Sequence, residues 1–277
     1  MSNQAIDGFW INIVADVVVL GLTALLKWVH GKLALANPAD RVWRVAAVGI
    51  FWIVINTAYA YFFARSAALI IFLSSVLIGW IVRSELNQFW RIGLVGADDQ
   101  IQAGINFKRA LGMVSNSMDF LGIGAAKLTD ERTEFEAAVG RCQRPSRPVR
   151  FLLCRPDSDK LIEMAQSAEK DRDLYQKKVL DSLRAIADLR IKRAWNVQVR
   201  FYPEFPTFRL MFIDDAICLA SHYVLGKGSG AELPQLHVVR PTGSRDVDSL
   251  YYGFSSYYDR FWATADDWDF KQYLEEP

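Results

Sequence analysis

The sequence contains few of the residues that build metal sites and disulfide frameworks. It has 3 cysteines and 3 histidines in 277 residues. The cysteines, Cys142, Cys154 and Cys218, fit no Cys-x-x-Cys or Cys/His ligand spacing, so the sequence predicts neither a zinc site nor a set of disulfides. We expect no metal and no cofactor, and we expect the cysteines to be small core residues in a reducing compartment.

A strong net charge is also missing. The chain has 32 Lys and Arg against 31 Asp and Glu, which gives a formal net charge of +1 at pH 7. This balance excludes a protein that coats nucleic acid and a chain with an acidic disordered tail. Internal repeats and low-complexity tracts are absent as well. A membrane protein and a local basic pocket both stay compatible with the composition.

The apolar residues are concentrated in the first third of the chain. Residues 9–26 form an apolar run close to the length of about 20 residues that crosses a bilayer as a helix,. No basic residue precedes this run, which argues against a cleavable signal peptide. A second run, residues 45–82, is interrupted by a charge only at Arg65, so it forms either a hairpin of two spans or one long tilted helix. We predict a transmembrane module over residues 1–90, with spans at about 9–27, 45–64 and 67–82.

The distribution of basic residues sets the orientation of these spans. Lysine and arginine collect in cytoplasmic loops, and the loop after the first run carries Lys27, Lys32, Arg41 and Arg44, whereas the segment before it carries none. The sequence therefore places the amino terminus outside and the first loop inside. Three spans leave the rest of the chain in the cytoplasm, while two spans export it. We predict a multi-pass protein of the inner (cytoplasmic) membrane with a cytoplasmic C-terminal domain and the lipid bilayer as a partner.

Four residues with charged or amide side chains interrupt the apolar runs: Asn12, Asp16, Asn56 and Arg65. An ionisable group inside a membrane is costly and faces a partner or water. An ion pair between Asp16 and Arg65 would join the first span to the hairpin. Alternatively, Asn12, Asp16 and Asn56 line an assembly interface or a pore, which predicts a homo-oligomer.

Beyond residue 91 the pattern changes to alternating strands and helices. The fold class we predict is α/β or α+β, with a mixed sheet in a domain of residues 91–277 that is parallel at first and antiparallel where strands follow one another directly. The polar stretch 98–108 is expected to be a connecting helix. Strands are expected at 118–125, 149–154, 197–202, 207–213, 216–221 and 235–240, and helices at 129–142, 158–194 and 249–262.

The strand pair between Thr207 and Ser221 carries a family resemblance. Its sequence, TFRLMFIDDAICLAS, resembles the signature strand pair of the phospholipase D superfamily, in which His-x-Lys is followed after four residues by Asp and after six more by Gly-Ser-x-Asn. The upstream order of a strand ending in glycine (FLGIG), a helix, a strand (VRFLLC), a helix and a strand (VQVRFY) resembles one half of that family. The resemblance covers roughly residues 115–262 and implies a phospholipase D-like domain.

The resemblance breaks at the positions that carry the family's chemistry. Thr207 stands where the family has its nucleophilic histidine, Arg209 stands where it has lysine, and Asp214 is retained. Ser221 and His222 occupy the Gly-Ser position, and Val224 replaces the final asparagine. The family's reaction passes through a phosphohistidine, and a threonine without an adjacent base is a poor substitute for imidazole. The resemblance therefore implies a degenerate domain in which no residue is catalytic.

An anion pocket is what the replaced positions can still supply. The guanidinium of Arg209 offers planar, bidentate donors suited to phosphate. Lys227 lies in a glycine-rich stretch, residues 226–230, that does not match a phosphate-binding loop and is either a surface hairpin or a lid over the anion. The candidate ligand-binding residues are Thr207, Arg209, Asp214, Ser221, His222 and Lys227.

These observations support three hypotheses about function. The first is a non-catalytic membrane sensor or effector whose cytoplasmic domain binds a phosphorylated small molecule, such as a nucleotide signal, and changes the assembly of the membrane helices. Its layout resembles that of bacterial antiviral effectors. The second is an active membrane-bound phosphodiesterase or phospholipase, in which His222 supplies the imidazole. The third is a non-catalytic scaffold that docks a soluble protein at the membrane.

Overall fold

The computed structural model describes residues 75, 76, 79, 83, 86, 87, 89–143, 147–223, 230–241 and 248–273. The chain divides into two compact units, Met1–Ile81 and Val82–Pro277. The first two predicted spans and most of the third lie outside the described residues. Among the residues that are described, no helix has both the length and the apolar character needed to cross a membrane.

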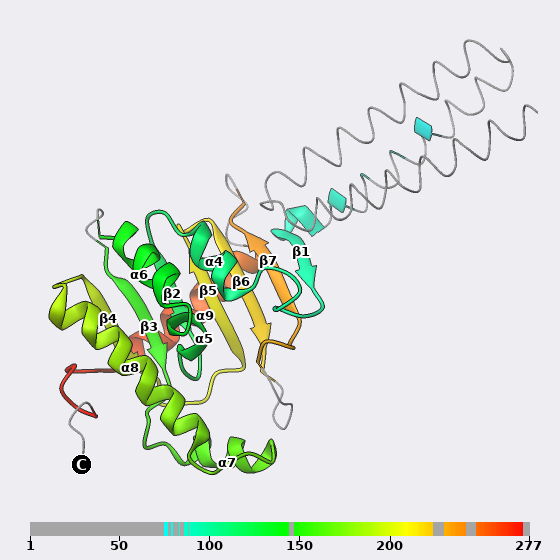
Figure 1. Cartoon of the computed structure of the whole chain (residues 1–277). Helices are drawn as coiled ribbons and strands as arrows, with labels where there is room; N and C mark the ends of the chain where they lie inside the picture. The colour runs from blue at the N-terminus through cyan, green and yellow to red at the C-terminus, as the bar shows by residue number, and fades with distance from the viewer. Residues whose placement is uncertain are drawn as a thin grey trace, which may run out of the picture. The chain divides into compact units, whose positions relative to one another are not determined.

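The described part of the C-terminal unit is built on one sheet of eight strands. Their order across the sheet is β1-β7-β6-β5-β2-β3-β4-β8, and Figure 1 shows it from the side of most of the helices. The central strands β2, β3 and β4 are parallel, and the other pairs are antiparallel. The predicted mixed sheet is confirmed. The bounds are β1 Leu94–Asp98, β2 Met118–Leu121, β3 Val149–Leu153, β4 Val197–Phe201, β5 Phe208–Ile213, β6 Ile217–His222, β7 Gln235–Val239 and β8 Asp266–Asp267.

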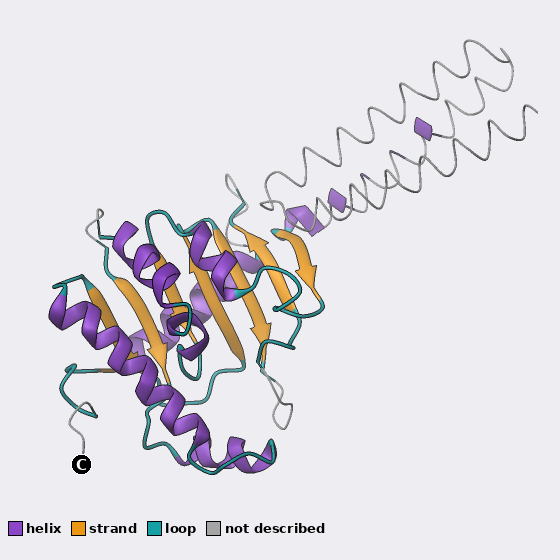
Figure 2. Ribbon diagram, in the orientation of Figure 1, coloured by secondary structure: helices purple, strands orange, loops and turns teal. Residues whose placement is uncertain are grey.

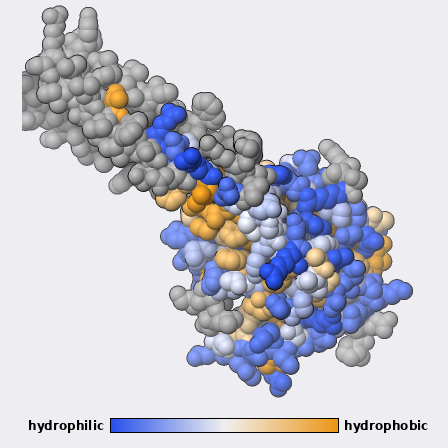
Figure 3. Space-filling model, turned by 180° about the vertical axis from the view of Figure 1, so that it is seen from behind, coloured by the Kyte–Doolittle hydropathy of each residue, from blue (hydrophilic) through white to orange (hydrophobic). Residues whose placement is uncertain are grey.

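Helices cover both faces of the sheet (Figure 2). The helices α4, α5, α6 and α8 lie over one face, with α7 beside the first turns of α8, and α9 lies over the opposite face. On the α9 side, hydrophilic residues predominate at the described surface (Figure 3). The bounds are α4 Phe107–Met113, α5 Ala126–Thr129, α6 Arg132–Arg141, α7 Asp159–Ser167, α8 Leu174–Lys192 and α9 Leu250–Thr264.

Two predicted helices differ from the structure. The polar stretch 98–108 is not a helix, because the Asp98 carboxylate accepts the Ile105 N–H at 2.7 Å and Asn106 caps the start of α4. The expected helix 158–194 is divided into α7 and α8, and Glu169 between them adopts a left-handed backbone with φ 52°,. The expected helix 129–142 corresponds to α6, which begins at Arg132. Strands β1 and β8 were not predicted.

The core lies on both sides of the central strands. Phe120 and Phe151 pack with Phe135 of α6 on one face of the sheet. Phe212 packs with Tyr251 and Tyr258 of α9 on the opposite face. The prediction that the three cysteines are small core residues is confirmed, since all are buried and free of disulfide bonds.

A buried ion cluster fastens α9 to the sheet. The Asp119 carboxylate on β2, only 3% exposed, accepts hydrogen bonds from Arg150 at 2.9 and 2.6 Å and pairs with Arg147. The Arg150 guanidinium in turn lies 5.0 and 5.1 Å from the ring centroids of Tyr258 and Trp262 on α9. Asp215 also pairs with Arg147, so a second carboxylate offsets the charge of the second arginine, and this face of the sheet is held by polar as well as apolar contacts.

We predict that Asp119→Asn lowers the free energy of unfolding by about 3–5 kcal/mol, because it removes the buried carboxylate that pairs with both guanidinium groups and leaves Arg150, among the described residues, with only the more distant, exposed Asp259,. Urea unfolding of the full chain in detergent measures the change. The matched control is Asp259→Asn, which removes a 60% exposed carboxylate 3.7 Å from the same Arg150 and should cost less than about 1 kcal/mol. Equal losses in the two variants would contradict a structural role for the cluster.

Candidate functional site

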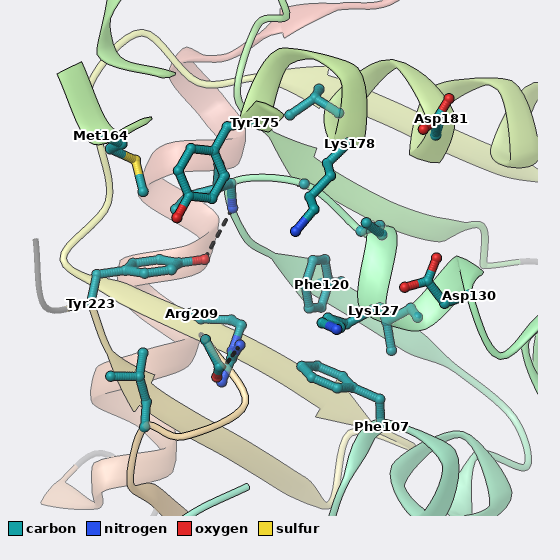
Figure 4. Close-up of a pocket in the computed structure, with 18 residues that line it drawn as sticks. Phe107, Phe120, Lys127, Asp130, Met164, Tyr175, Lys178, Asp181, Arg209 and Tyr223 are labelled. Carbon is teal, nitrogen blue, oxygen red and sulfur yellow. Dashed lines mark hydrogen bonds between the residues drawn. The ribbon is translucent and has the colours of Figure 1, made fainter. Parts of the chain in front are cut away.

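A cavity of about 340 Å³ lies on the face of the sheet that α4, α5, α6 and α8 cover. Its walls come from the start of α4, strand β2 and the loop after it, helices α5, α7 and α8, strand β5, and the segments that follow β6 and precede β7. Figure 4 shows the residues around it. Most of the lining is apolar or aromatic, and it includes Phe107, Phe120, Met164, Tyr175, Val179 and Leu233. A volume above about 300 Å³ is in the range of small-molecule sites.

Arg209 is the buried cation of this cavity. Its residue is 9% exposed, and its guanidinium lies 5.0 Å from the ring centroid of Phe107. Its Nη1 donates to the Gly230 carbonyl at 3.1 Å, whereas its Nη2 is buried and finds no partner among the described residues. Burial lowers the pKa of Arg209, and within the described residues no carboxylate forms an ion pair with it. The cavity therefore contains a buried positive charge with a hydrogen-bond donor that no described residue uses.

The pairing of β5 with β6 explains why Arg209 faces the cavity. Successive side chains of a strand point to opposite faces of the sheet. Phe208 pairs with His222 and Arg209 pairs with Ser221. Phe208 packs against Phe254 of α9, with ring centroids 5.4 Å apart, so Arg209 must point to the other face.

Tyr223 is a cavity residue that the sequence prediction omitted. Its hydroxyl accepts the Ile123 N–H at 3.0 Å, and its own N–H donates to the Thr207 carbonyl at 3.0 Å. Burial raises the pKa of Tyr223. The alternation of side chains along a strand could have identified it. Tyr223 follows Ser221 by two residues and therefore shares its face of the sheet.

Exposed charged residues surround the side of the cavity away from Arg209 and Tyr223 (Figure 4). Lys127 on α5 and Lys178 on α8 both line it, together with Asp130 and Asp181. All four residues are exposed. The Lys178 side chain extends toward the middle of the cavity. A ligand in this space would therefore meet the buried guanidinium at one end and solvated charges at the other.

The structure does not bring Thr207 to the cavity. Thr207 is exposed, and its N–H donates to the Tyr257 hydroxyl of α9 at 2.9 Å. It precedes β5 and is absent from the lining.

His222 lies on the other side of the sheet. Its ring meets Phe208 edge-on, with centroids 5.8 Å apart, and the residue is exposed. The expectation that His222 assists Arg209 needs correction, because the alternation of β6 directs the imidazole to the α9 face. Ser221 shares the face of Arg209, and its Oγ is buried without a partner among the described residues, although Ser221 does not line the cavity.

Asp214 lies in the turn between β5 and β6. It has a left-handed backbone, φ 55°, and its carboxylate accepts the N–H groups of Ser115, Asn116 and Ser117 at 3.0, 2.6 and 3.0 Å. This places Asp214 at the far end of β5 from Arg209. The structure therefore separates two residues that the sequence analysis grouped in one candidate site.

Several predicted residues lie outside the described part of the chain. Lys227 is one of them, and the polar residues of the predicted spans, Asn12, Asp16, Asn56 and Arg65, are the others. Within the described residues, no group of His, Cys, Asp and Glu side chains is arranged to hold a metal ion.

Comparison with protein-family models gives no match, and comparison with curated proteins gives none either. Among solved structures, the chain is similar to Nuc from Salmonella typhimurium, described as a phospholipase D family member. The two chains are 10% identical, the TM-score is 0.34, and the match covers 58% of this chain and 88% of Nuc.

Asp214→Gly tests whether Asp214 acts on the fold alone. We expect the free energy of unfolding to fall by about 1–3 kcal/mol, because three backbone donors lose their acceptor while glycine still accommodates the left-handed backbone. Phosphate affinity, measured by calorimetry, should stay that of the wild type. A tenfold loss of affinity at unchanged stability would assign Asp214 to the binding site instead.

Proposed function

We propose that the C-terminal domain binds a phosphorylated small molecule in the cavity beside Arg209 and does not hydrolyse it. The observation that carries the proposal is the buried guanidinium, whose Nη2 has no partner in the part of the chain that the structure describes. A buried charge without a counter-ion is costly. An anion in the cavity would offset that cost, and phosphate oxygens match the donors of arginine.

The lining supports a nucleotide as the phosphorylated ligand. The cavity is large enough for a small molecule and rich in aromatic rings, among them Phe107, Phe120 and Tyr175. A planar base can stack on such rings while a phosphate reaches Arg209. The proposed ligand class is therefore a nucleotide signal.

Binding without hydrolysis follows from the chemistry that the phospholipase D superfamily requires. In the sequence resemblance, the nucleophilic position holds Thr207, whose side chain lacks the imidazole that forms a phosphohistidine. His222, the residue proposed to replace it, sits on the opposite face of the sheet from Arg209. Release of the alcohol from a phosphodiester by the purified chain, abolished in His222→Ala, would instead support the active-phosphodiesterase hypothesis.

The proposal extends to the membrane module. The apolar runs at residues 9–26 and 45–82 and the basic loop between them support an anchor in the inner membrane with the binding domain in the cytoplasm,. Ligand binding acts on the assembly of the membrane helices if the ligand binds the assembled form more tightly than the resting form. The proposed role in bacterial antiviral defence derives from this layout of a membrane module followed by a ligand-binding domain.

Arg209→Met tests the binding site. We expect phosphate affinity to fall at least about tenfold, because a charge-assisted hydrogen bond is lost. The free energy of unfolding without ligand should be unchanged or higher, since a buried charge is removed. Calorimetry with nucleoside 5′-phosphates and urea unfolding of the full chain measure the two quantities.

The matched control is Arg190→Met. Arg190 also lies over a phenylalanine ring, 5.7 Å from the centroid of Phe270, but it is exposed and lines no part of this cavity. It should bind phosphate like the wild type. Wild-type affinity in Arg209→Met would refute the proposed site, and a protein that functions without Arg209 would favour the scaffold hypothesis.

Cysteine labelling of intact cells tests the predicted topology. A membrane-impermeant maleimide should label Ser2→Cys from outside, and should label Lys32→Cys and Ser167→Cys only after permeabilisation. The native cysteines should add little background, because they are buried and burial raises the pKa of Cys142 to about 12. External labelling of Ser167→Cys would show that the domain is exported and would rule out the three-span arrangement.

A further inference from the structure

The two ends of the Arg209 cavity differ in burial. Arg209 and Leu233 are 9% and 8% exposed, whereas Lys127, Lys178 and Asp130 are exposed. Figure 4 shows Arg209 and Tyr223 on one side and Asp130 on the other. The inner end therefore holds the part of a ligand that enters first, and the outer end opens toward solvent.

The side chains at the inner end offer hydrogen-bond donors. A phenol has one O–H donor and two acceptor lone pairs. The Tyr223 oxygen already accepts the Ile123 N–H at 3.0 Å, and within the described residues no acceptor takes its hydrogen. Burial raises the pKa of Tyr223, so its hydroxyl stays protonated. Arg209 contributes its Nη2, which has no partner among the described residues, and the only carboxylates in the described lining are at the outer end.

We propose that this inner end selects a terminal phosphate in its doubly charged form, with Tyr223 and Arg209 as its two donors. The inference rests on the proposed function and names the chemistry of the ligand, a phosphate monoester. A monoester carries its second charge above a pKa of about 6, and the described lining has no carboxylate at the inner end to accept the hydrogen of a protonated phosphate oxygen. A phosphodiester carries a substituent on each of two ester oxygens, and the buried inner end does not accommodate the second substituent.

Other charged groups also face this cavity. They are Lys127 and Asp130 at α5, and Lys178 and Asp181 on α8. A pH effect must therefore be assigned to the ligand rather than to these side chains. Comparing a monoester with its methyl diester does so, because the same protein groups titrate in both experiments and only the monoester changes its own charge.

The experiment is calorimetry on the full chain in detergent at pH 5.0 and 7.5. The soluble probes are phenyl phosphate and adenosine 5′-monophosphate, each paired with its methyl ester. We expect the monoesters to bind about tenfold more tightly at pH 7.5, since the doubly charged fraction rises from about one tenth to nearly all. The methyl esters should bind more weakly and with no such dependence.

A lipid can carry the same chemistry, so a second arm distinguishes the sources. The full chain is incorporated into phosphatidylcholine nanodiscs containing either phosphatidic acid, a monoester, or phosphatidylmethanol, its diester counterpart. Competition against adenosine 5′-monophosphate only by phosphatidic acid identifies a lipid headgroup as a ligand. Absence of competition identifies a soluble phosphate.

Two tyrosine variants complete the test. Tyr223→Phe should weaken monoester binding at least about tenfold at pH 7.5 and leave diester binding unchanged. Tyr257→Phe is the matched control, because its hydroxyl also accepts a backbone N–H, that of Thr207 at 2.9 Å, but lies outside the cavity. It should bind like the wild type, and melting temperatures of both variants check the fold.

The outcomes separate this inference from the proposed function. Equal binding of monoester and diester at both pH values, with wild-type affinity in Tyr223→Phe but loss in Arg209→Met, refutes the inference and leaves the proposed function in place. Binding of diesters alone also refutes the inference. Absence of binding by every phosphate probe refutes both.

Discussion

Strand β5 separates aromatic packing against α9 from the cationic side chain in the cavity, because its side chains alternate between the faces of the sheet. Phe208 and Phe212 project toward α9 and pack on its aromatic rings. Arg209, between them in sequence, projects to the opposite face and lines the cavity. A shift of one residue in the pairing of β5 with β6 would exchange these sets, placing the guanidinium under α9 and the phenyl rings in the cavity. The candidate site therefore depends on this register.

The buried charges on the two faces have different environments. On the α9 face, Asp119 binds both Arg147 and Arg150, and Arg150 also contacts aromatic rings. These interactions have partners within the domain, so they fit a structural role. Within the described residues, Arg209 contacts one carbonyl and one phenyl ring, and its Nη2 has no partner. A group that folding leaves incompletely satisfied in a cavity is a reasonable place to expect a ligand.

Sequence patterns predicted most strands because their apolar runs are short and bounded by polar or turn residues. Strand β1 was missed because its sequence, LVGAD, is weakly apolar and precedes a polar stretch that resembles a helix. Strand β8 has two residues and no pattern. The break between α7 and α8 was missed because Glu169 adopts its left-handed backbone without a glycine or proline to mark it. For the two strands, the missing information was the pairing with a segment distant in sequence.

The sequence by itself determined the apolar first third, the mixed α/β pattern of the rest, and Arg209 as the residue best suited to hold an anion. Only the tertiary structure decided which candidates lie near it, because strand parity and register act across segments that are far apart in the chain. Tyr223 reaches the cavity, His222 turns to α9, and Asp214 caps the segment before β2. The family pattern counts residues along one strand pair, whereas a site requires that side chains meet in space.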